Sequence, residues 1–184
     1  MSRDLTYLTR LAAGGLAAAI ALGACASPDR PSVMPEDVEL PTPMRSFGAS
    51  VQRSVAALEA ALLSVGERLG EPMGAYRPSE PEPLLQTPRV LRRVELADPD
   101  DGFIVIYQAQ SSGAAGDLAA GLAEYVASGF GQTNYAADTQ FSVSTLGDTV
   151  IFTTWSRRRS VDPERAEAAF DAIASVGSPV DVNK

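Results

Sequence analysis

The sequence predicts an α+β domain with a four-stranded antiparallel sheet, and three observations lead to this fold class. Residues 89–128 contain two strand patterns followed by a helix pattern, and residues 140–176 repeat that order. A longer helix pattern, in residues 46–70, precedes both units. Two strand-strand-helix units pack most simply as one sheet with both of their helices on a single face. The first helix is then free to cover the other face.

The helix predicted for residues 46–70 is the first element in chain order. Its apolar residues recur at steps of three and four and therefore follow one helix face. Part of this pattern also fits a heptad repeat, so a coiled-coil or oligomerisation helix is an alternative. The repeat lasts fewer than four heptads and alanines widen its apolar side, which favours packing against the chain's own sheet. The stripe consists of Phe47, Val51, Val55, Leu58, Leu62, Val65 and Leu69.

A proline-rich connector, residues 71–88, follows this helix. Because proline lacks a backbone N–H and disrupts both helices and central strands, we expect the connector to form neither. We interpret it as a long surface loop. Its prolines are Pro72, Pro78, Pro81, Pro83 and Pro88.

Two β-hairpins are predicted, each from a pair of apolar, β-branched segments around a turn. The first turn is the Asp-Pro-Asp-Asp-Gly sequence of residues 98–102, and the second is Gly147-Asp148. Both sequences are typical of tight turns. The four predicted strands are residues 89–96, 103–109, 140–146 and 149–155.

Each hairpin is followed by a helix pattern. Residues 114–128 place apolar side chains at helical spacing, and Asp162-Pro163 begins a second helix that runs to about residue 176. The first of these helices is rich in alanine and is associated with Gly113, Gly116 and Gly121. We expect close packing to account for these glycines, rather than a phosphate-binding loop.

Alternation along the strands separates two apolar faces. One face is expected to lie under the two later helices. The reverse face is also too apolar to stay bare in a monomer, and the helix at 46–70, a second copy of the domain, or a ligand or partner protein could cover it. We expect the helix to do so. The first face consists of Phe103, Val105, Tyr107, Phe141, Val143, Val150 and Phe152, and the reverse face includes Ile104, Ile106, Ile151 and Trp155.

The first 25 residues have the pattern of an export signal. Arg3 and Arg10 precede an uncharged apolar run that is too short to span a membrane. The run ends in Leu22-Gly23-Ala24-Cys25, which resembles the lipobox of bacterial lipoproteins. An ordinary secretory cleavage site is the alternative.

The resemblance implies a processed and acylated chain. Residues 1–24 would be removed as the signal peptide, and Cys25 would carry a diacylglyceryl group on sulfur, with fatty acids such as palmitate. Two or more acyl chains give stable membrane anchoring where one is marginal. Ala26, which is not aspartate, resembles the outer-membrane sorting pattern of Gram-negative lipoproteins. We therefore expect a cell-envelope protein that faces outside the cytoplasm, in the periplasm or beyond.

The chain is thereby divided into three parts. After the signal peptide, residues 25–45 hold the lipidated cysteine and a tether rich in proline and acidic residues. Residues 46–184 form a single α+β domain, in which residues 89–184 are the ββαββα core.

Composition excludes several classes of function. The formal net charge is −8, which argues against nucleic acid as a partner and against adhesion to anionic lipid. There is no histidine, so Ser-His, Cys-His and His-metal chemistry are absent. Cys25, the only cysteine, is assigned to lipid. We expect no cofactor and no enzymatic activity, with a carboxylate-dependent hydrolase as the minor alternative.

One candidate binding site is identified, at the end of the last predicted strand. Trp155 is followed by Arg157, Arg158 and Arg159, which could bind an anionic ligand or an acidic partner. A charge run at a strand end is more often solvated, and tryptophan more often belongs to the core. The acidic residues of the turn at 98–102 loosely resemble a calcium loop, but proline interrupts them and we expect no metal site.

These observations favour a lipid-anchored envelope protein that acts as a binding or structural interaction module. The membrane, an envelope protein or a second copy of the chain are the expected partners. The alternative is a small-ligand binder that uses the sheet face around Trp155. It would need a deep pocket lined by Trp155, Ile104 and Ile106, whereas a structural module would have these side chains already packed.

Overall fold

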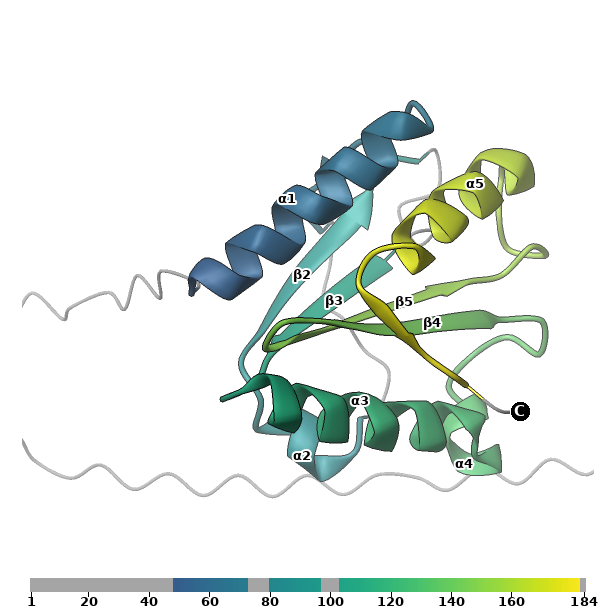
Figure 1. Ribbon diagram of the computed structural model, residues 1–184. Helices are drawn as coiled ribbons and strands as arrows, with labels where there is room; N and C mark the ends of the chain where they lie inside the picture. The colour runs from purple at the N-terminus through teal and green to yellow at the C-terminus, as the bar shows by residue number, and fades with distance from the viewer. Residues whose placement is uncertain (1–47, 73–79, 97–102, 183–184) are drawn as a thin grey trace, which may run out of the picture. The chain divides into compact units, whose positions relative to one another are not determined.

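The computed structural model describes residues 48–72, 80–96 and 103–182. These residues form an antiparallel sheet of six strands with helices on both faces (Figure 1). The α+β class is confirmed, whereas the sheet has two strands more than predicted. In chain order the elements are α1 (Ala49–Ser64), β1 (Leu69–Gly70), α2 (Glu82–Leu85), β2 (Arg89–Val94), β3 (Phe103–Gln108), α3 (Ser112–Ala127), α4 (Gly129–Gln132), β4 (Gln140–Leu146), β5 (Thr149–Trp155), α5 (Pro163–Ala174) and β6 (Ser178–Val180).

The strands are arranged in the order β1-β2-β3-β5-β4-β6, and every neighbouring pair is antiparallel. The two predicted hairpins, β2–β3 and β4–β5, are joined by the pairing of β3 with β5, which sets Ile106 opposite Ile151. Gly147 has φ +63° in the β4–β5 turn, a left-handed conformation that glycine adopts without strain. Both predicted strand pairs therefore form, and the turn of the second follows its sequence, while the turn of the first lies outside the described residues.

The two additional strands lie at the edges of the sheet. β1 pairs with the end of β2, and β6 pairs with β4. The sequence pattern placed Leu69 and Gly70 in the last turn of the first helix. The helix instead ends at Ser64, because Gly66 takes φ +81° and the N–H of Glu67 donates to the carbonyl of Leu62, 2.9 Å away.

The proline-rich connector contains one turn of helix, α2, so the prediction that it forms none was wrong. Pro81 is the N-cap residue of α2, and Pro83 lies in its first turn. Prolines are compatible with a first turn, whose N–H groups have no partner within the helix. Pro88 then follows closely, and α2 stays short.

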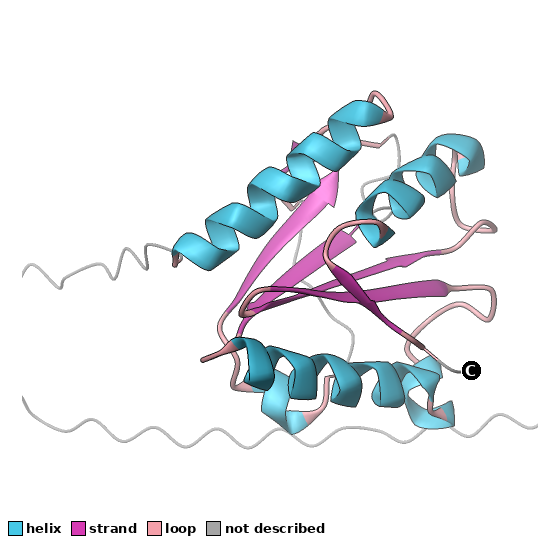
Figure 2. Ribbon diagram, in the orientation of Figure 1, coloured by secondary structure: helices cyan, strands magenta, loops and turns pink. Residues whose placement is uncertain are grey.

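The helices cover the sheet from both sides, as Figure 2 shows by colour. α3 packs on the face that carries Val105, Tyr107 and Phe152. α1 and α5 pack on the reverse face, with Leu58 and Ile173 in one buried cluster with the isoleucines of β3 and β5. The expectation that the first helix covers this reverse face is confirmed.

The placement of α5 corrects the prediction that both later helices share one face. The connections β3–α3–β4 and β5–α5–β6 each join parallel strands across one intervening strand, and both step in the same direction across the sheet. β3 and β5 themselves run in opposite directions. Because such crossovers are almost always right-handed, two of them that start from opposite strand directions place their helices on opposite faces.

Candidate functional site

The sequence-predicted candidate Trp155 belongs to the core. Its side chain is 3% exposed and packs beneath α5, with its ring centroid 6.2 Å from that of Phe170. Ile104 and Ile106 of the same sheet face are fully buried under α1 and α5. The face around Trp155 is thus filled by the chain's own helices.

The three arginines after Trp155 form an exposed turn between β5 and α5. The Arg157 guanidinium donates to Glu167 at 3.0 Å, and the backbone N–H of Arg158 donates to Asp138, also at 3.0 Å. This backbone hydrogen bond, with one from the Ser156 hydroxyl, lowers the pKa of Asp138 below its usual value. Hydrogen bonds to Asp138 and Glu167 therefore hold the turn, while Trp155 itself is buried against Ala166 and Phe170 of α5.

Two other features that the sequence predicts lie outside the described residues. These are Cys25 with its leader, and the acidic turn at 98–102. In the part of the chain that is described, no group of three or more His, Cys, Asp or Glu side chains is positioned to hold a metal ion. None of the helices described there is long and apolar enough to cross a bilayer.

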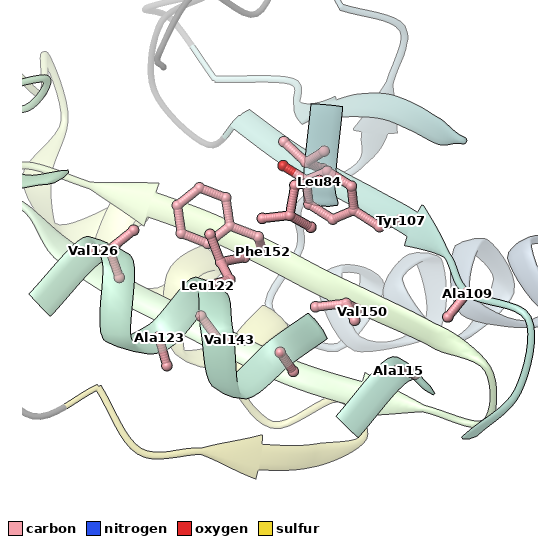
Figure 3. Packing of buried hydrophobic residues seen from close by; sticks show 12 residues of the cluster. Leu84, Tyr107, Ala109, Ala115, Leu122, Ala123, Val126, Val143, Val150 and Phe152 are labelled. Carbon is pink, nitrogen blue, oxygen red and sulfur yellow. The ribbon is translucent and has the colours of Figure 1, made fainter. Parts of the chain in front are cut away.

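An apolar groove of 570 Å³ lies between α2 and α3. α3 packs over β4, β5 and β6, and the four-residue α2 is too short to close the remaining space beside it. The core side chains Leu84 and Leu122 contribute to the lining of the groove from its two sides, with Leu118 nearby on α3. Figure 3 shows Leu84 beside Tyr107 and Leu122 beside Phe152. The groove thus opens from the hydrophobic core.

A buried polar network fixes the position of α2. Glu80, which precedes the helix, accepts a hydrogen bond from the hydroxyl of Tyr107 and pairs with the guanidinium of Arg89. Burial and the Glu80 carboxylate both raise the pKa of Tyr107, so the phenol stays a protonated donor. The network links the connector to β2 and β3, and it holds one wall of the groove in place.

Polar groups surround the apolar part of the groove. Gln86 and Gln110 place amide side chains at its border, the Gln108 amide lies instead beside Gly48, and Asp117 is the only charged residue of the lining. The helices of this side, α2, α3 and α4, carry three acidic residues and no basic residue along their described lengths. The helices of this side are therefore acidic, and Arg89, which follows the lining residue Pro88, has its charge paired with Glu80.

The glycines of α3 have a different setting from the one the sequence predicted. A Cβ atom at Gly116 or Gly121 would have no atom within 4 Å, so close packing does not explain either residue. Gly121 lines the groove and leaves it open. The residue pattern gave no sign of this groove, because Leu118 and Leu122 are four residues apart and therefore lie on the one stripe of α3 that faces the core.

Comparison of the chain with protein-family models, with curated proteins and with solved structures found no match.

Proposed function

We propose that this chain is a bacterial cell-envelope lipoprotein, anchored through an acylated Cys25, whose α+β domain acts as a protein-interaction module. The groove between α2 and α3 is the observation that carries the binding role. Apolar concave sites with a few polar groups are the usual form of a binding site. The leader sequence that ends at Cys25 supports the membrane anchor and a location outside the cytoplasm, at the outer membrane in a Gram-negative host.

The lining of the groove favours binding over catalysis. Asp117 is its only carboxylate, and an acid-base pair built from carboxylates would need a second one in reach. The packed state of Trp155 and its isoleucine neighbours supports an interaction module rather than a small-ligand site on that sheet face. Neither observation depends on the leader.

Acylation is tested by metabolic labelling with an alkyne analogue of palmitate in a bacterial host, together with intact-mass spectrometry of the protein. We expect a labelled, membrane-bound protein that starts at Cys25. The Cys25→Ser variant serves as the control and should be unlabelled and absent from the membrane fraction. An unprocessed amino terminus or a free thiol at Cys25 in the wild type would contradict the anchor.

The binding role is tested in intact cells by a photo-crosslinking amino acid at position 121, inside the groove. Position 116, on the same helix but outside the groove, is the matched control. We expect crosslinked adducts at position 121 that do not form at position 116. Equal adduct patterns at both positions, or none at either, would argue against a binding groove.

A further inference from the structure

We propose that the groove between α2 and α3 binds an extended peptide segment that carries apolar side chains and at least one lysine or arginine. This inference rests on the proposed function and specifies the chemistry of the partner. It combines three properties of the groove: its apolar lining, its amide side chains and its acidic surroundings.

The apolar lining favours a partner with hydrophobic side chains. Leu84 and Leu122 are buried core residues that border the groove, and Leu118 is half-buried beside them. Gly121 adds space because it has no side chain. A volume of 570 Å³ lies within the usual range of binding pockets, about 300–1,000 Å³. Removal of apolar side chains from water is the main driving force for such binding.

The amide side chains favour a peptide over a lipid tail. Gln86, which follows α2, and Gln110, in the loop after β3, border the groove from its two sides, whereas the Gln108 amide lies beside Gly48 at the start of α1. Each amide has both donors and an acceptor, and a peptide backbone offers the complementary acceptor and donor at every residue. An acyl chain has neither and would form no hydrogen bond with these exposed amides.

The charge distribution favours a basic segment. Asp117 lies in the groove, and Glu82 and Glu124 are the other charged residues of α2, α3 and α4. Acidic surroundings attract a cationic partner and select against an anionic one. The same charges disfavour a fatty-acid carboxylate or an anionic lipid head group.

The proposal is tested with the full chain, purified with its anchor in a non-ionic detergent. A phage-displayed library of random nonapeptides is selected against it, and the enriched peptides are synthesised and titrated by calorimetry. We expect peptides that combine apolar residues with lysine or arginine. Gly121→Leu should weaken their binding at least tenfold because the new side chain fills the groove, and Asp117→Asn should weaken it about threefold.

Matched controls keep the test independent of folding. Gly116→Leu adds the same side chain to the same helix outside the groove, and Glu59→Gln removes an exposed charge from α1, which packs on the opposite face of the sheet. Both should leave the affinity unchanged within twofold. Far-UV circular dichroism and the unfolding midpoint check each variant. A Cβ at position 121 meets no atom, so Gly121→Leu is expected to fold.

Several outcomes would overturn the inference. Enriched peptides that are acidic or uncharged, a lack of enrichment over detergent alone, or affinities insensitive to Gly121→Leu would each do so. Binding of oleate or of phosphatidylglycerol vesicles that Gly121→Leu abolishes would assign the groove to lipid instead. An acidic or neutral protein partner would contradict this inference but leave the proposed interaction module intact.

Discussion

Replacement of Leu62 by alanine tests whether α1 is part of the folded core. Leu62 is 0% exposed and belongs to the buried cluster that α1 forms with α5 and the sheet. The substitution removes buried apolar atoms and leaves a cavity, and such changes cost about 2.7–5.0 kcal/mol at fully buried leucines. We expect a loss of about 3 kcal/mol, a large part of the roughly 5–15 kcal/mol by which folded proteins are stable.

The neighbouring residue Leu63 provides the control, because its side chain is 71% exposed on the outer surface of α1. Leu63→Ala should change the free energy of unfolding by less than about 0.5 kcal/mol. Urea unfolding of the full chain, followed by far-UV circular dichroism, measures both variants against the wild type. If Leu62→Ala destabilised the protein no more than Leu63→Ala, the packing of α1 on the sheet would be refuted.

Two further substitutions test local features. Gly116→Ala should raise the free energy of unfolding by roughly 0.5–1 kcal/mol, because alanine is the better helix former and its Cβ meets no atom at this position in α3. An unchanged or lower urea midpoint would contradict this prediction. Asp138 has a lowered pKa in the folded state, so its ionised carboxylate stabilises the protein at pH values above the usual carboxyl pKa of about 4. This stabilisation is lost as the pH falls through the lowered pKa of the folded state. The difference in urea midpoint between wild type and Asp138→Asn should therefore shrink between pH 7 and pH 3, and a constant difference would argue against the Asp138 contacts.

The local elements of the fold could be predicted because their sequence signals are short-range. Gly147-Asp148 marked the β4–β5 turn, and the alternation of apolar residues assigned Val105 and Ile104 to opposite faces, as the structure has them. The position of α5 depends on the order of strands in the sheet, which no local pattern contains. Once β3 is known to pair with β5, the handedness of the crossovers determines it.

The groove could not be predicted either, because it too depends on the tertiary arrangement and not on a local sequence pattern. It depends on how far α3 lies from α2, and the sequence suggested no helix in the connector. The predicted site residues, Trp155 and the three arginines after it, were chosen because tryptophan and clustered arginine are common in binding sites. In the structure Trp155 is buried, and Arg157 is paired with Glu167. The groove between α2 and α3 is lined instead by residues such as leucine, glutamine and glycine, and these residue types do not indicate a binding site in a sequence.

The burial of Trp155 has a practical consequence for experiments on this protein. It is the only tryptophan of the chain, and within the described residues its indole N–H has no hydrogen-bond partner. An indole shielded from water fluoresces at a shorter wavelength than one in solvent. The intrinsic emission therefore reports whether α5 is seated on the sheet, while the groove, on the opposite face, can be titrated without disturbing that signal.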